Sequence, residues 1–122
     1  MTDLADYKKL YLKSARKHLK ILSKNIALFL KNPSNQSALD QAHLHTHSLK
    51  SQSLVMGYPK TGALCRSLET IFYKIKERKK ILTNANIKSI QISLQQLTEL
   101  IQLIEKTGQE MENSKIQMTK PK

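Results

Sequence analysis

The sequence has few of the residues that break helices or crosslink a chain. Its 122 residues include 3 glycines, 3 prolines, 1 cysteine and no tryptophan. Scarce glycine and proline favour long helices joined by few turns. A single cysteine, Cys65, excludes a framework of internal disulfides and is typical of a reducing compartment. We therefore expect a helical protein of the cytoplasm.

Long apolar runs are also missing. Charged residues interrupt the N-terminal stretch MTDLADYKKLYLKSARK every few positions. This stretch has no apolar centre for a signal peptide, and it lacks the roughly 20 apolar residues that cross a membrane. We expect neither secretion nor membrane insertion. A glycine-rich nucleotide loop is absent as well, so we expect no ATP site and no autonomous enzyme.

Acidic residues are scarce relative to basic ones. The chain has 21 Lys and Arg against 9 Asp and Glu, a net charge of +12. Such a charge favours binding to nucleic acid or to an anionic membrane surface, and we keep this as one of two hypotheses for the function. Against it, the lysines are spread over several predicted helices, and no helix-turn-helix or RNA-binding signature is present. We expect most lysines to form a solvated face that attracts an acidic partner.

Apolar residues recur every three or four positions in four segments of the chain. They predict helices over residues 3–31, about 37–56, about 59–80, and from 83 or 84 to 107. Turn-forming residues, including Pro33, Gly57 and Gly108, separate or end these segments. Four amphipathic helices with short connections predict an all-α fold, an antiparallel up-down-up-down four-helix bundle. We place one monomeric domain at 1–108 and a tail or the start of a linker at 109–122.

In the first two predicted helices, the positions of the apolar residues also predict which side chains face the core. The apolar stripe of the first comprises Tyr7, Leu10, Tyr11, Ala15, Leu19, Leu22, Ile26, Phe29 and Leu30. In the second, at 100° per residue, His47 points away from the apolar side whereas His45 faces it. We therefore expect His47 to be exposed and His45 to be wholly or partly buried.

Three of the four histidines lie close together, at positions 43, 45 and 47. His43 and His47 are four residues apart, a spacing at which two imidazoles can share a metal ion on one helix face. No Asp or Glu lies between residues 43 and 50 to serve as a third ligand. We expect no metal site, and we expect His43 to line a groove or the surface.

The chemistry of an imidazole makes His47 a candidate phosphoryl carrier. A neutral imidazole can attack phosphorus when its protonated nitrogen is bound by an acceptor. Lys50 follows one turn later on the same face, where its charge would neutralise a transferred phosphoryl group. The small residues Ser51, Ser53 and Gly57 would leave room for a partner. Because a His-x-x-Lys pair is common, an ordinary exposed histidine is the alternative.

The segment HSLKSQSLVMGY, followed by ALCRSLETIF, resembles the histidine phosphotransfer domains of two-component signalling. It is most similar to the N-terminal phosphotransfer domain of chemotaxis-type histidine kinases. That motif is commonly His-Ser/Thr-Leu/Ile-Lys-Gly, with a second glycine ten residues after the histidine. His47, Lys50 and Gly57 match it, and Leu68-Glu69 resembles the leucine–glutamate pair of the next helix. The resemblance covers roughly residues 3 to 107.

The resemblance implies a function and a set of roles. His47 would be phosphorylated, Lys50 would assist electrostatically, and Glu69 would fix the proton on the other imidazole nitrogen. The partners would be a histidine kinase ATP-binding domain as donor and an aspartate of a response-regulator receiver domain as acceptor. ATP and Mg²⁺ would belong to these partners, so no cofactor is expected here. The chain would be a carrier, either free-standing or the N-terminal part of a larger kinase.

The chain departs from that family near the histidine. Ser51 and Gln52 stand where the family usually has glycine or another small residue. Arg66 stands where chemotaxis members often have a second histidine. We expect Ser51 and Gln52 to alter the approach of a partner directly after Lys50, and Arg66 to pair with Glu69 or with the phosphoryl group.

Overall fold

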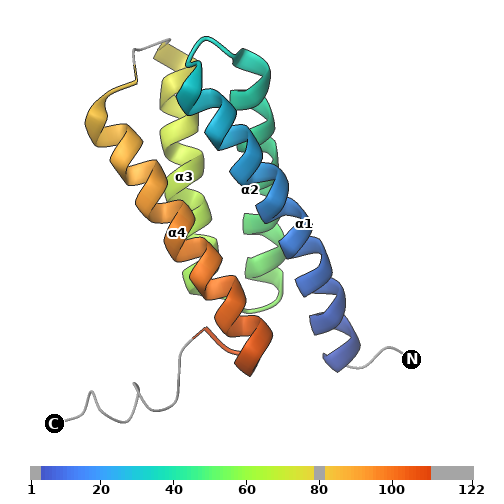
Figure 1. The fold of residues 1–122 in the computed structure, drawn as a ribbon. Coiled ribbons are helices and arrows are strands. Elements are labelled where there is room, and N and C mark those ends of the chain that lie inside the picture. The colour runs from blue at the N-terminus through green and yellow to red at the C-terminus, as the bar shows by residue number, and fades with distance from the viewer. Residues whose placement is uncertain (1–3, 79–81, 111–122) are drawn as a thin grey trace, which may run out of the picture.

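The fold is a bundle of four helices. The computed structural model describes residues 4–78 and 82–110, which form α1 (Leu4–Lys31), α2 (Gln36–Val55), α3 (Pro59–Arg78) and α4 (Asn84–Thr107). Successive helices run in opposite directions, and α1 and α3 each pack against both α2 and α4 (Figure 1). The predicted all-α, up-down-up-down bundle is confirmed.

The helix ends lie where turn-forming residues predict them. The side chain of Asn35 accepts a hydrogen bond of 3.0 Å from the backbone of α2, and Thr83 caps α4 in the same way at 3.0 Å. Gly57 and Gly108 follow α2 and α4 with φ of 80°, a left-handed conformation that costs glycine little. Residues 79 and 80, predicted as the end of the third helix, lie outside the described residues.

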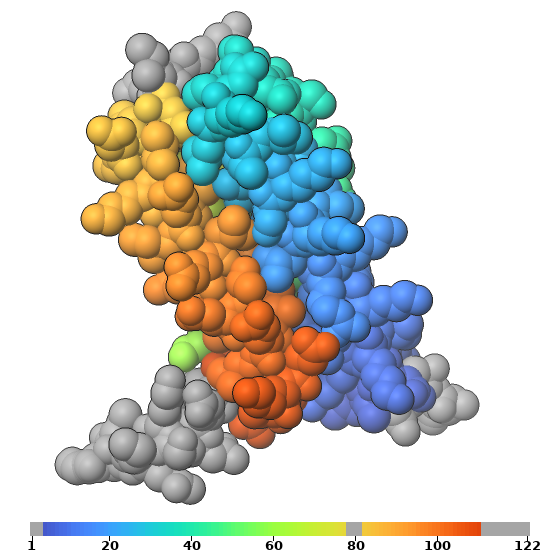
Figure 2. Space-filling model, viewed as in Figure 1, coloured from blue at the N-terminus to red at the C-terminus, as the bar shows by residue number. Residues whose placement is uncertain are grey.

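All four helices contribute to the apolar core. Fully buried side chains include Leu22, Phe29, Leu49, Leu68, Phe72, Ile90 and Leu97. Burying a side chain of this size contributes roughly 1.5–3 kcal/mol, so the helices are stable mainly through their packing. Figure 2 shows α1 and α4 side by side on one face of the molecule.

The stripe predicted for the first helix was wrong at its N-terminal end. Tyr7 is 52% and Leu10 is 61% exposed, whereas Tyr11 is buried. Leu10 lies 100° around the helix from Tyr11, which turns it away from the core. Tyr7 precedes Tyr11 by one turn, and Tyr11 is the first buried residue of α1. The core therefore begins at Tyr11.

Ser53 was predicted to leave space for a partner, and this was wrong. Its side chain is buried, and its hydroxyl lies 2.8 Å from that of Tyr11 on α1. The ring of Tyr11 also packs against Tyr58, with centroids 5.2 Å apart. Burial raises the pKa of Tyr11 to about 12, so both hydroxyls keep their protons and one donates to the other. Ser53 therefore links α2 to α1 through a buried hydrogen bond and is not available to a partner at the surface.

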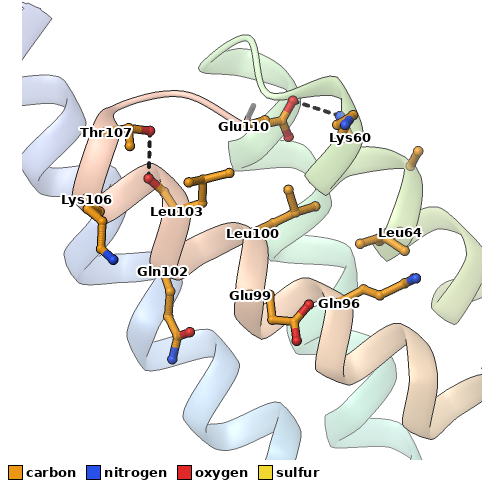
Figure 3. A pocket seen from close by; sticks show the side chains of 11 residues that line it. Lys60, Leu64, Gln96, Glu99, Leu100, Gln102, Leu103, Lys106, Thr107 and Glu110 are labelled. Atoms are coloured by element: carbon orange, nitrogen blue, oxygen red, sulfur yellow. Dashed lines mark hydrogen bonds between the residues drawn. The ribbon is translucent and has the colours of Figure 1, made fainter. Parts of the chain in front are cut away.

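Glu110 contacts the first turn of α3. Its carboxylate accepts hydrogen bonds from the backbone of Lys60 at 3.0 Å (Figure 3) and from the backbone of Thr61 at 2.5 Å. A carboxylate is favoured there because the N–H groups of a first helical turn lack partners within the helix. Glu110 belongs to the predicted tail, of which 111–122 lie outside the described residues. The division after residue 108 stays a prediction.

Candidate functional site

His47 and Glu69 meet across the contact between α2 and α3. Nδ1 of His47 lies 2.6 Å from Oε2 of Glu69. The imidazole is 57% exposed and the carboxylate only 18%. Both residues lie well inside their helices, so packed backbone fixes the positions of both. The expectation that His47 faces away from the core is confirmed.

Lys50 binds the other oxygen of the same carboxylate. It lies one turn after His47, and its Nζ is 2.6 Å from Oε1 of Glu69. Burial by itself raises the pKa of Glu69, but hydrogen bonds from Lys50 and His47 outweigh burial and leave the pKa below its ordinary value. Glu69 is therefore ionised at neutral pH.

The charge on Glu69 determines the tautomer of His47. A carboxylate can only accept hydrogen bonds, so the hydrogen of a neutral imidazole lies on Nδ1. The second nitrogen, Nε2, then carries the lone pair. Because the imidazole is more than half exposed, a reagent from solution can reach it. The geometry presents one oriented nucleophilic nitrogen at the surface.

A second histidine reaches the same carboxylate. Nε2 of His43 lies 3.4 Å from Oε2 of Glu69, and its Nδ1 lies 3.4 Å from Nζ of Lys76. Lys76 also pairs with Asp40, at 3.2 Å. Burial and then the charge of Lys76 lower the pKa of His43, which keeps it neutral at pH 7. The imidazole lines a groove of about 530 Å³ between α2 and α3.

The other predicted site residues lie around this cluster. Ser51 is exposed one turn after His47, and Gly57 is exposed where α2 ends. Arg66 is exposed on α3 and lines the same groove as His43 and Lys50. Within the described residues, 4–78 and 82–110, Arg66 forms no ion pair with Glu69. The other expectation for Arg66, contact with a phosphoryl group, stays a prediction.

The contact of Lys76 with His43 was not predicted from the sequence. Lys76 lies seven residues after Glu69, hence two turns along the same face of α3, and this spacing was a usable signal. The burial expected for His45 is confirmed, since it is half-buried with Nδ1 2.8 Å from Nδ1 of His18. The sequence offers no pattern that pairs two histidines on different helices.

Elsewhere the described surface offers other features. A groove of about 890 Å³ lies between α3 and α4 (Figure 3), and none of the predicted site residues lines it. In the part of the chain that the structure describes, no three His, Cys, Asp or Glu side chains are arranged to hold a metal ion. Within these residues no helix is long and apolar enough to span a membrane.

The fold and the site define a class of protein, a helical module that presents one oriented histidine at its surface. The Hpt domain family matches residues 6–107, so the chain belongs to this family of histidine phosphotransfer domains. Hpt domains are phosphoryl carriers of two-component signalling.

A solved structure has a similar fold. The CheA phosphotransferase domain from Thermotoga maritima superposes on the chain with a TM-score of 0.75. The sequences are 21% identical, and the match covers 86% of this chain and 99% of that one. At this identity the likeness shows the fold. No curated protein matches the chain.

Proposed function

We propose that His47 accepts a phosphoryl group from the ATP-binding domain of a histidine kinase and passes it to an aspartate of a response-regulator receiver domain. The observation that carries this proposal is the 2.6 Å contact between Nδ1 of His47 and the ionised Glu69, which leaves Nε2 free at the surface. Membership of the Hpt domain family supports phosphoryl transfer in general. The choice of nitrogen rests on the geometry.

Acceptance of the phosphoryl group needs no proton to leave the protein. The lone pair on Nε2 of His47 forms the N–P bond as the bond from the γ-phosphorus of ATP to its bridging oxygen breaks, and ADP leaves with that electron pair. Positive charge develops on the imidazole ring. The carboxylate of Glu69 stabilises this charge because it already binds Nδ1–H.

Donation reverses the charge change. A carboxylate oxygen of the receiver aspartate forms the new O–P bond, the N–P bond breaks, and the electron pair returns to Nε2. Mg²⁺ and the acidic pocket belong to the receiver, and ATP belongs to the kinase domain. The ammonium group of Lys50 is bound to Oε1 of Glu69, close to His47. Lys50 therefore assists through its positive charge near the phosphoryl group.

The remaining predicted residues form the surface that a partner meets. Ser51 is exposed within the last turns of α2, Gly57 is exposed just after its end, and Arg66 and His43 line the groove beside Lys50. We assign Arg66 to the phosphoryl group or to the partner. Exposed lysines of α1 attract acidic receivers over a distance that depends on salt. We place this function in the cytoplasm and in a domain that ends near residue 108.

Labelling with a kinase tests the proposal. Histidine kinase domains of the source organism and radiolabelled ATP should phosphorylate the wild type at an acid-labile, alkali-stable site. His47→Gln should take no label, whereas His45→Gln, a matched change two residues away, should keep it. Label that survives His47→Gln contradicts the assignment. Salt-dependent binding to nucleic acid or anionic vesicles, with no labelling of His47, favours the alternative function that the net charge of +12 suggests.

A further inference from the structure

His43 and His47 share one oxygen of Glu69. Oε2 lies 2.6 Å from Nδ1 of His47 and 3.4 Å from Nε2 of His43. His43 is one turn before His47 on α2, and its side chain is 19% exposed. The other oxygen, Oε1, binds Lys50. Three side chains of α2 therefore surround a single carboxylate of α3.

Contacts on the far side of His43 favour the same tautomer as its contact with Glu69. Nζ of Lys76 lies 3.4 Å from Nδ1 of His43 and 3.2 Å from Oδ1 of Asp40. An ammonium group can only donate, so Nδ1 of His43 must carry the lone pair. The hydrogen of the neutral ring then lies on Nε2, where it faces Glu69.

We propose that His43 and Lys76 are positioning residues for phosphoryl acceptance: Lys76 selects the Nε2–H tautomer of His43, which orients Oε2 of Glu69 towards His47. This inference rests on the proposed function of His47. It gives a role to a histidine that does not itself take the phosphoryl group.

The physical reason is the freedom of a glutamate side chain. Rotation about the last bond of the side chain is broadly allowed. A carboxylate that Lys50 binds through Oε1 can therefore turn Oε2 away from His47. A hydrogen facing Oε2 from His43 opposes that rotation. Without Lys76, only the contact of Nε2 with Oε2 of Glu69, at 3.4 Å, still favours the Nε2–H tautomer of His43. The Nδ1–H tautomer then becomes more populated, and its Nε2 lone pair repels the carboxylate.

Imidazole nitrogen NMR tests the proposal without any partner. In the full chain labelled with ¹⁵N, two-bond ¹H–¹⁵N spectra should show Nδ1–H for His47 and Nε2–H for His43. Lys76→Met should shift His43 towards Nδ1–H and give His47 a mixture of tautomers. Lys74→Met is the matched control, because it removes the same charge from α3 beside His43, and within the described residues Lys74 forms no hydrogen bond or ion pair with His43.

The rate of phosphoryl acceptance is the second measurement. Phosphoramidate, a small phosphoryl donor, should phosphorylate His47 roughly 3- to 10-fold more slowly in Lys76→Met and His43→Leu, the loss expected for one hydrogen bond. His43→Gln keeps an N–H donor near the position of Nε2 and should remain within about twofold of the wild type. Lys74→Met should do the same.

Two outcomes overturn the inference. One is an unchanged tautomer of His47 in Lys76→Met and His43→Leu, and the other is an unchanged rate in both. Lys76 is partly exposed, so its variant keeps the test open if His43→Leu does not fold. If the tautomers are as predicted but wild-type His47 takes no phosphoryl group from kinase or phosphoramidate, the proposed function fails and the positioning contacts stand.

Discussion

Glu69 of α3 binds Nδ1 of His47 of α2 at a distance of 2.6 Å. The two residues are 22 positions apart in the sequence, and the packing of α2 on α3 brings them together. This contact turns an exposed histidine into one with a defined tautomer and a nearby negative charge. The following predictions depend on it or on the bundle that maintains it.

Replacing Glu69 should slow phosphoryl acceptance. Glu69→Gln removes the charge that stabilises the ring as the N–P bond forms, and a hydrogen bond to a charged group is worth about 1.5–3 kcal/mol. The initial rate with a kinase domain and ATP should fall roughly 10- to 100-fold. Glu77→Gln, an exposed change on the same helix, should leave the rate unaltered. An equal effect of both variants would remove Glu69 from its assigned role.

The same glutamate should make stability depend on pH. Because contacts lower the pKa of Glu69 below 4.5, its carboxylate stabilises the fold at pH values above 4.5. That contribution is lost as pH falls through the lower, folded-state pKa. In urea unfolding at pH 7, the free energy of unfolding of the wild type should exceed that of Glu69→Gln by about 1 kcal/mol. This difference should vanish near pH 2. A difference that does not change with pH contradicts this account.

The buried hydroxyl pair between α1 and α2 should show coupled energies. Ser53→Ala leaves the hydroxyl of Tyr11 buried without its partner, which costs roughly 1–3 kcal/mol of unfolding free energy. Adding Tyr11→Phe removes that hydroxyl and should recover much of the loss. A double-mutant cycle by chemical denaturation measures the coupling. Additive effects of the two changes would show that the hydroxyls do not interact.

Cys65 should be chemically inert in the folded protein. Its side chain is buried, and burial raises the pKa of the thiol to about 12. Little thiolate is present at pH 8, so a disulfide reagent should react only as fast as the chain unfolds. Adding denaturant should release the full reactivity of one thiol per chain. Fast reaction without denaturant would contradict the burial of Cys65.

Much of the fold was predictable because its signals are local. Apolar spacing indicated each helix, and Asn35, Thr83 and Gly108 act within a few residues of the helix ends that they determine. The exposure of His47 and the half-burial of His45 follow from 100° per residue. Tyr7 and Leu10 escaped this reasoning because periodicity does not tell where along a helix its neighbours begin.

The site was predictable only in part, because its contacts join different helices. His47 and Lys50 share a helix face, so their spacing is visible in the sequence. Glu69 was identified through a resemblance, and its distance from His47 depends on how α2 packs on α3. Lys76 was missed because its contact with His43 links residues 33 positions apart, although its spacing from Glu69 places both on one face of α3. Ser53 was misassigned because small size alone does not distinguish a surface position from a tight helix contact.

Nε2 of His47 is the proposed phosphoryl acceptor. The most direct measurement is ³¹P and ¹⁵N NMR of the phosphorylated, ¹⁵N-labelled chain, combined with mass spectrometry of its peptides under alkaline conditions. We predict one phosphoryl group per chain, bonded to Nε2 of His47, with the hydrogen still on Nδ1. A phosphoryl group on Nδ1 of His47, or on any other residue, would contradict the account.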